Sequence, residues 1–304
     1  KVHVQNEEVE KTIHRFCGYG FEEERVEIHN KYMAWHDKMA GARLSYIDNE
    51  PKLVKYLHDG LIADDVLVEM EGLFYLRDSE TKLHADHKRE LKSIYNKMNI
   101  WLRNKKMYEE RQFMYVSGTA GCGKSHLLYR EALEISNCQR VYMLLGSEFS
   151  SLESPEDTIA RVMGWNGHDP LNELNDKLAH EEGRTATIII DALNEGAGTH
   201  FWMEQLPVLK NKISRYNHLK MIVSLRTLYK EDRLNDILRD DWYPMKVGGF
   251  NNRKKAIGDY FAAYEIMTNE TPYTKIAEFS NPLFLRLFCE TYYSLTQEER
   301  EKVL

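Results

Sequence analysis

The feature that most constrains this chain is the run GTAGCGKS from Gly118 to Ser125, which lies between an apolar stretch and a helix-forming one. The run fits the pattern G-x-x-x-x-G-K-[ST] of phosphate-binding loops. Its glycines permit backbone conformations in which consecutive N–H groups turn inward around a phosphate, and the following helix adds its positive N-terminal end. We therefore expect Lys124 to reach the β and γ phosphates of a nucleotide and Ser125 to hold a magnesium ion.

The whole loop is a candidate nucleotide ligand, together with the residue that follows it. The residues expected to contact the nucleotide are Gly118, Thr119, Ala120, Gly121, Cys122, Gly123, Lys124, Ser125 and His126. Cys122 has two interpretations, a small side chain that fits the loop or a redox-sensitive thiol, and the first is favoured.

An acidic residue should complete the metal site from the end of a neighbouring strand, because magnesium prefers hard oxygen ligands. Asp191 closes the apolar run IIID and is the candidate. Glu195 follows four residues later and is the candidate general base for an attacking water. The alternatives are a strand-end turn residue for Asp191 and, for Glu195, a charge that interacts with a helix N-terminus.

Arg226 ends a further apolar run, at the same expected edge of the sheet. An arginine there can contact the γ phosphate and stabilise charge in the transition state. An ion pair with a neighbouring acid is an almost equal alternative. Further along, the sequence from Ser280 to Leu283 begins the last long helix with a turn residue and Pro282, which by itself indicates only a good helix start.

The distribution of apolar runs after Glu110 predicts an α/β fold with a mainly parallel sheet, since short apolar runs alternate with amphipathic stretches. Five strands are expected, at Gln112–Ser117, Arg140–Leu145, Thr185–Asp191, Leu219–Leu225 and Trp242–Val247. The run Thr187–Ile190 is apolar on both faces and is expected in the middle of the sheet.

The 304 residues suggest about two domains, and helical periodicity flanks the sheet region on both sides. We expect a mostly helical flanking region over residues 1–107, a nucleotide-binding domain over 108–249 and a helical subdomain over 250–304. Val66–Leu76 reads as a strand or a hairpin. In the first region Asp64, Asp65 and Glu69 could suggest a nuclease, but the expected lysine is missing, so an adaptor or linker is preferred.

The charge balance bears on partners and location. With 48 acidic and 41 basic side chains the net charge is −7, which does not favour binding to nucleic acid or to an anionic membrane. The sequence shows neither an apolar run near 18 residues nor a signal peptide, so we expect a cytoplasmic protein. The four cysteines form no C-x-x-C pair, and His84 and His87 read as a solvated helical face rather than as metal ligands.

From about Arg111 onward the chain resembles the STAND class of P-loop NTPases, and within it the NACHT-like ATPases of bacterial antiviral Avs proteins. The resemblance depends on the loop GTAGCGKS together with IIIDALNEG from Ile188 to Gly196, VSLR ending at Arg226, and NPLFLRLFCE from Asn281 to Glu290. It implies ATP or ADP as the nucleotide, with magnesium. It also implies that Asp191 binds the metal, Glu195 positions water, Arg226 acts as a sensor and Pro282 packs against adenine.

The resemblance further implies a slowly hydrolysing switch that forms homo-oligomers and activates an attached effector after a sensor detects a viral protein. The effector and sensor domains of such proteins are not seen in this sequence, which resembles the ATPase module alone. Two other functions remain open. One is an AAA-type motor or loader that turns ATP over continuously, and the other is a binding module that holds ADP and never hydrolyses.

Overall fold

The computed structural model describes residues 7–41, 85–167, 169–181, 185–227, 234, 237–238, 242–267 and 272–303. The chain divides into two compact units, one formed by Lys1–Cys17 with Arg111–Leu304 and the other by Gly18–Glu110. Helix α1 (Glu7–Phe16) therefore groups with the sheet rather than with the helices that follow it. The expected strand or hairpin at 66–76, the nuclease candidates Asp64, Asp65 and Glu69, and His84 lie outside the described residues.

The first unit is built on a five-stranded sheet in the order β2-β3-β4-β1-β5, and every strand pair is parallel. The strands are β1 (Phe113–Gly118), β2 (Arg140–Leu145), β3 (Ala186–Asp191), β4 (Leu219–Arg226) and β5 (Tyr243–Lys246). All five predicted strands are present, with ends that differ by one residue at most. The α/β fold class with a parallel sheet is confirmed.

The expectation that Thr187–Ile190 lies in the middle of the sheet was wrong by one strand. β3 is an internal strand and is buried throughout, but the middle position belongs to β4. β4 is also buried at each residue except Arg226. An apolar run shows only that both faces of a strand are covered, so it cannot show which of two internal strands occupies the middle position.

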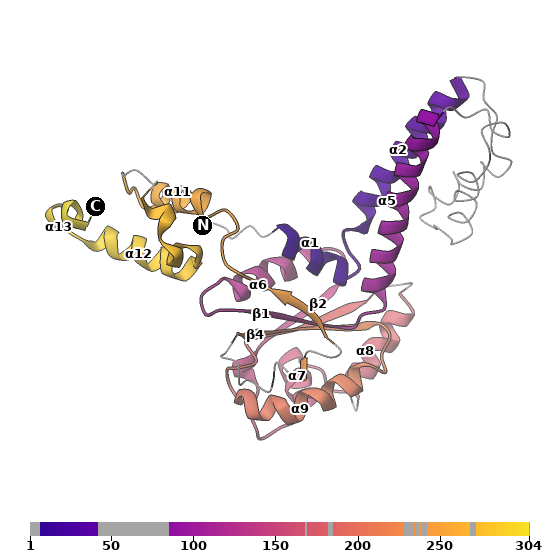
Figure 1. Cartoon of the computed structure of the whole chain (residues 1–304). Helices are drawn as coiled ribbons and strands as arrows, with labels where there is room; N and C mark the ends of the chain where they lie inside the picture. Colours follow the sequence, from indigo (N-terminus) through magenta and orange to yellow (C-terminus); the bar gives the residue numbers. More distant parts are fainter. Residues whose placement is uncertain are drawn as a thin grey trace. The chain divides into compact units, whose positions relative to one another are not determined.

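Helices cover both faces of the sheet, as the crossover connections of a parallel sheet require (Figure 1). Helices α1 and α6 (Lys124–Ile135) lie on one face, and α7 (Pro155–Met163), α8 (Pro170–Ala179) and α9 (Gly198–Ile213) lie on the other. A short 3-10 turn, η1, spans Gly146–Glu148. The core between sheet and helices is centred on fully buried apolar side chains such as Ile188, Ile190, Trp202, Leu206 and Leu209.

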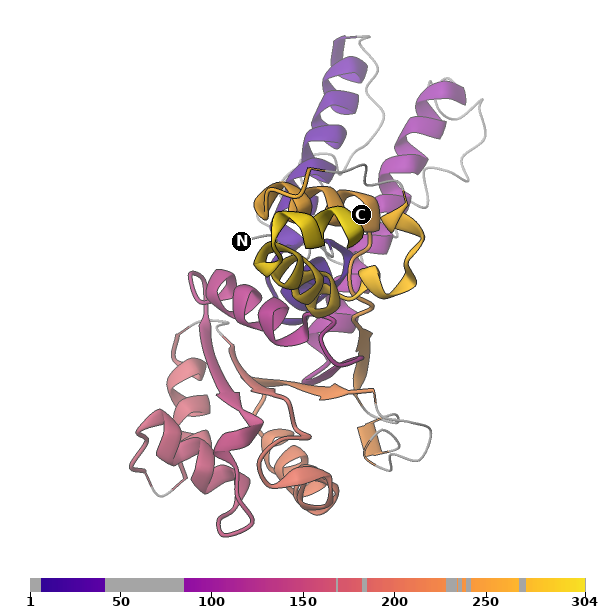
Figure 2. The ribbon, with the colours of Figure 1, turned by 90° about the vertical axis from the view of Figure 1, so that its left-hand side faces the viewer.

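The segment after β5 forms a helical subdomain with a hydrophobic cluster of its own, and Figure 2 shows its helices gathered together in orange to yellow. Its elements are α11 (Arg253–Ala263), η2 (Tyr273–Lys275), η3 (Ala277–Ser280), α12 (Pro282–Ser294) and α13 (Gln297–Val303). Ile257, Phe261, Phe279, Leu285 and Cys289 form the centre of the cluster.

The second unit contains α2 (Phe21–Gly41) and α5 (Ala85–Glu109), which pack against each other. The indole Nε1 of Trp101 donates to the carbonyl of Phe21 at 3.0 Å. Leu91, Ile94 and Met98 of α5 are buried, at the spacing of one helix face. His87 lies in α5.

Among the helices that the structure describes, none combines the length and the apolar character that a membrane crossing requires.

Candidate nucleotide-binding site

The loop between β1 and α6 has the backbone conformation that its glycines were expected to supply. Gly121 and Gly123 have φ values of +74° and +96°, in the left-handed region that other residues rarely adopt. Helix α6 begins at Lys124, and the residue that precedes it, Gly123, offers no side chain to cap the first N–H groups. The loop therefore leaves donors and the positive end of a helix for an anion.

The ammonium group of Lys124 is held inside this loop. Its Nζ donates to the carbonyl oxygens of Gly118 at 2.8 Å and Thr119 at 3.0 Å, and the Sγ of Cys122 lies 3.7 Å away. The residue is only 8% exposed. In this structure the ammonium group of Lys124 is thus engaged by carbonyl oxygens of the loop itself.

The helical subdomain contacts the loop directly. The backbone N–H of Leu283 donates to the carbonyl of Gly121 at 3.2 Å, and the side-chain amide of Asn281 donates to the carbonyl of Ala120 at 2.8 Å. A Cβ atom on Gly121 would lie 2.6 Å from the Cβ of Leu283, so only glycine permits this approach. The start of α12 is therefore joined to the phosphate loop.

Asp191 lies at the carboxyl end of β3, as predicted, but it is buried and its carboxylate is engaged. The hydroxyl of Ser224 on β4 donates to Asp191 Oδ1 in a short contact and accepts from the backbone N–H of Ala192 at 2.9 Å. Ala192 has a φ of +59°, a strained conformation for a residue with a side chain. Ser224 thus holds both the carboxylate and the turn that follows it.

Glu195 and Arg226 meet above the ends of β3 and β4. The Arg226 Nη2 donates to Glu195 Oε1 at 3.1 Å, and both side chains are about half exposed. The backbone N–H of Arg226 also donates to Asn194 Oδ1 at 3.2 Å. In this structure the alternative interpretation of Arg226, an ion pair with a neighbouring acid, is present, and its partner is the candidate general base.

A cleft of about 800 Å³ lies between the sheet edge and the helical subdomain. Nine predicted site residues belong to its lining: Ala120, Gly121, Gly123, Lys124, Ser125, His126, Glu195, Arg226 and Pro282. Gly118, Thr119 and Cys122 support the loop through the contacts with Lys124. Asp191 is 2% exposed and lies behind Ser224, which lines the cleft.

The chain has the fold of a P-loop NTPase. The geometry of this chain shows that fold: the described sheet has five parallel strands, the glycine-rich loop joins β1 to α6, and an aspartate ends β3. No protein-family model matches the chain, and no curated protein matches it. Among solved structures it is similar to a Walker-type ATPase of Pyrococcus abyssi, at 15% sequence identity over 76% of this chain and 75% of that chain, with a TM-score of 0.46.

The residues present fit a nucleotide with a magnesium ion. A Cβ atom on Gly121 would clash with the Cβ of Leu283 at 2.6 Å, and one on Gly118 would clash with the carbonyl oxygen of Val247 at 2.4 Å, so the loop keeps its shape only without side chains at these positions. The exposed hydroxyl of Ser125 and the carboxylate of Asp191 supply oxygen donors, the ligands that magnesium prefers.

Several residues of the cleft were not predicted as site residues. Ser224 lines the cleft but entered the sequence analysis only within the motif VSLR, and Asn281, which contacts the loop from outside the lining, entered it only at a helix start and within the motif NPLFLRLFCE. Tyr260, Tyr264, Leu283 and Arg286 come from the helical subdomain. A polar residue at the end of a wholly apolar strand could have indicated Ser224, whereas the subdomain residues carry no local signal, because their role depends on how α11 and α12 pack.

Proposed function

We propose that this chain is a nucleotide-operated switch that binds ATP with magnesium, hydrolyses it slowly, and changes the position of its helical subdomain according to the bound nucleotide. The observation that carries this proposal is the pair of hydrogen bonds from Asn281 and Leu283 to the phosphate loop. Any ligand that rearranges the carbonyls of Ala120 and Gly121 acts on the start of α12 at the same time. Binding and subdomain position are thereby coupled.

The phosphate loop supplies most of the binding in this proposal. Backbone N–H groups of the loop and the N-terminus of α6 bind the phosphates, and Lys124 exchanges its bonds to Gly118 and Thr119 for phosphate oxygens. Ser125 and Asp191 hold the magnesium ion, and Ser224 orients Asp191. A bound magnesium ion would supply positive charge that neutralises the phosphates.

Slow hydrolysis follows from the pair formed by Glu195 and Arg226. The Glu195 oxygen that accepts a hydrogen bond from Arg226 is not free to accept one from an attacking water. Both side chains are about half exposed, so the pair contributes at most about 1 kcal/mol and can be broken easily. We propose that Arg226 leaves Glu195 for a terminal phosphate, which both detects that phosphate and frees the base.

Adenine is the proposed base. Pro282 lines the cleft beside Leu283, Tyr260 and Tyr264, which offer apolar and aromatic surface to a planar ring. The finer biological role is proposed from the resemblance to STAND ATPases of antiphage defence. In that role the switch works in the cytoplasm, assembles into a homo-oligomer, and activates an effector when a sensor binds a viral protein.

Titration calorimetry of the full chain tests the binding step. We expect wild type to bind ATP with magnesium, and Lys124→Ala to lose at least tenfold in affinity because a charge-assisted contact to phosphate is removed. Lys177→Ala, on the exposed side of α8, is the matched control and should bind as wild type does. Equal affinity in wild type and Lys124→Ala, or no binding in either, would reject the proposal.

Phosphate release separates the three candidate functions. The switch predicts slow release that Glu195→Gln abolishes and that the exposed control Glu204→Gln leaves unchanged. High basal turnover would favour an AAA-type motor or loader. Tightly held ADP with no release in wild type would favour a module that never hydrolyses.

A further inference from the structure

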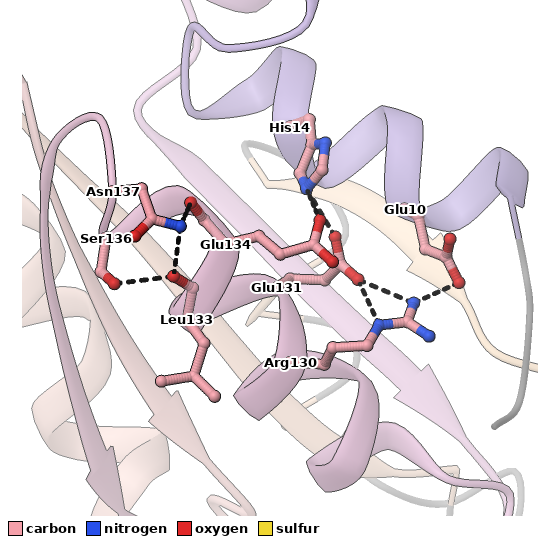
Figure 3. Close-up of polar contacts among 8 residues, drawn as sticks. All are labelled: Glu10, His14, Arg130, Glu131, Leu133, Glu134, Ser136 and Asn137. Carbon is pink, nitrogen blue, oxygen red and sulfur yellow. Dashed lines mark hydrogen bonds and ion pairs between the residues drawn. The ribbon is translucent and has the colours of Figure 1, made fainter. Parts of the chain in front are cut away.

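A second cluster of ionisable side chains lies away from the cleft, where α1 packs against α6 (Figure 3). His14 projects from α1, and Glu131 and Glu134 project from α6 at a spacing of three residues, which places them on the same side of that helix. The His14 Nε2 lies 2.7 Å from Glu131 Oε2 and 3.6 Å from Glu134 Oε2. All three ligand atoms lie within 4.8 Å of one another.

The position of His14 is set by contacts of the α1 C-terminus. Lys220 Nζ donates to the carbonyl of Phe16 at 2.5 Å, and Gln139 Nε2 donates to the carbonyl of Cys17 at 2.6 Å. Ile13 and Phe16 are fully buried. The imidazole is therefore presented to α6 by a helix that is fixed on both its apolar face and its last turn.

Glu131 is the unusual member of the cluster. Its side chain is 1% exposed, yet its two oxygens are in different situations. Oε1 accepts two hydrogen bonds from the Arg130 guanidinium, at 3.1 and 2.8 Å. Oε2 is buried and accepts no well-directed hydrogen bond from the described residues, although His14 Nε2 lies only 2.7 Å away. A buried carboxylate oxygen in this situation is costly unless a cation or a donor faces it.

With His14 neutral, as a metal ligand must be, the charges of the cluster do not balance. The contact with Glu131 raises the pKa of His14, so a proton competes with a metal ion for this position. Glu10, Glu131 and Glu134 contribute three negative charges and Arg130, which pairs with Glu10 and Glu131, contributes one positive charge. The difference is two negative charges. One divalent cation would neutralise it.

We propose that His14 Nε2, Glu131 Oε2 and Glu134 Oε2 bind a divalent transition metal ion of the zinc class, with water completing the coordination. An imidazole with two carboxylates suits zinc and disfavours magnesium and calcium, which take oxygen ligands. Tetrahedral zinc at about 2.0 to 2.2 Å from each ligand spaces the ligand atoms by about 3.3 Å. The 3.6 Å distance from His14 Nε2 to Glu134 Oε2 is close to that value. The 2.7 Å distance from His14 Nε2 to Glu131 Oε2 must increase by about half an ångström when the ion binds.

The surroundings supply what a metal site requires beyond its ligands. Arg130 fixes the carboxylate of Glu131 from its other oxygen, as outer-shell groups do in metal sites. Glu134 is about half exposed and gives an entry path from solvent. A bound ion would join α1 to the helix whose first turn holds Lys124 and Ser125, and so would stabilise this unit.

Titration of the full chain with zinc chloride, after treatment with a chelator and without magnesium or nucleotide, tests this site separately from the proposed function. We expect one site in wild type, and a loss of about tenfold or more in affinity in His14→Gln and in Glu134→Gln. Affinity should fall as pH decreases, because protons compete for the imidazole. Cobalt substitution should give a visible absorption spectrum that His14→Gln lacks.

The matched control is His200→Gln. On an exposed helix face, His200 Nδ1 lies 3.9 Å from Glu204 Oε1, but among the described residues no third potential metal ligand joins this pair. It should bind zinc as wild type does. Far-ultraviolet circular dichroism establishes that each variant folds, and Glu134→Gln alters only a half-exposed side chain. Zinc binding that is absent, or that is equal in wild type, His14→Gln and Glu134→Gln, would overturn the proposal whatever the outcome of the ATP titrations.

Discussion

The side-chain amide of Asn281 donates to the carbonyl of Ala120 at 2.8 Å and so joins the helical subdomain to the phosphate loop. The same side chain caps α12, since its Oδ1 accepts from the backbone N–H groups of Leu283 at 3.0 Å and Phe284 at 3.3 Å. One residue thus both starts the helix and fixes it to the loop. These two roles use different atoms and can be separated by substitution.

Replacing Asn281 tests whether the contact with Ala120 supports nucleotide binding. Asn281→Asp keeps the cap acceptor but loses the donor, so we expect a stability loss below about 1 kcal/mol together with weaker ATP affinity. Asn281→Ala loses both roles and should destabilise by about 2 kcal/mol, about 1 for the cap and about 1 for the hydrogen bond. Urea unfolding and ATP titration measure the two effects. Unchanged ATP affinity in Asn281→Asp would show that the contact has no part in binding.

Gly121→Ala tests the close approach of α12 to the loop, and Gly164→Ala is its matched control. Both glycines have positive φ, +74° and +68°, but a Cβ on Gly164 would meet no atom within 4 Å. In the control, backbone strain alone should lower the free energy of unfolding by about 1 kcal/mol. Gly121→Ala adds the clash with Leu283 and should lose a further 1 to 3 kcal/mol or so. Equal losses by urea unfolding would contradict the steric argument.

Ser224→Ala tests the support of Asp191. The substitution leaves a buried carboxylate oxygen and the N–H of Ala192 without their shared partner, which should cost about 1 to 3 kcal/mol. The magnesium concentration needed for ATP binding should also rise. The control is Ser214→Ala. The exposed hydroxyl of Ser214 donates to the carbonyl of Asn211, and its removal should change the free energy of unfolding by no more than about 0.5 kcal/mol. If Ser224→Ala needs the same magnesium concentration for ATP binding as wild type, Ser224 has no part in the metal site.

Cysteine alkylation reports on the packing of the helical subdomain. Burial, with a smaller effect of Glu290, raises the pKa of the Cys289 thiol to about 12, so at pH 8 only about one molecule in ten thousand carries the reactive thiolate there. Cys138 is exposed. Iodoacetamide at pH 8 should therefore label Cys138 and spare Cys289, and raising the pH to 10 should still leave Cys289 slow. Peptide mass spectrometry after native and urea-unfolded labelling checks this, and equal native rates would contradict it.

Much of the candidate site could be predicted, because its main parts are local in sequence. The loop from Gly118 to Ser125 has its expected conformation, Asp191 ends β3, and Arg226 ends β4. What could not be predicted were the partners of these groups. The bond of Ser224 to Asp191 and the pair of Arg226 with Glu195 join residues about thirty positions apart, whose meeting depends on the pairing of β3 with β4.

The sequence by itself determined the strands, the phosphate loop and the helices that the structure describes on either side of the sheet region, since side-chain periodicity and glycine freedom act over a few residues. Only the tertiary structure decided that β4 rather than β3 lies in the middle, that α1 groups with the sheet, and that α12 begins against the loop. These outcomes depend on which buried surfaces fit each other across the whole unit. Non-local packing of that kind leaves no short pattern in the chain.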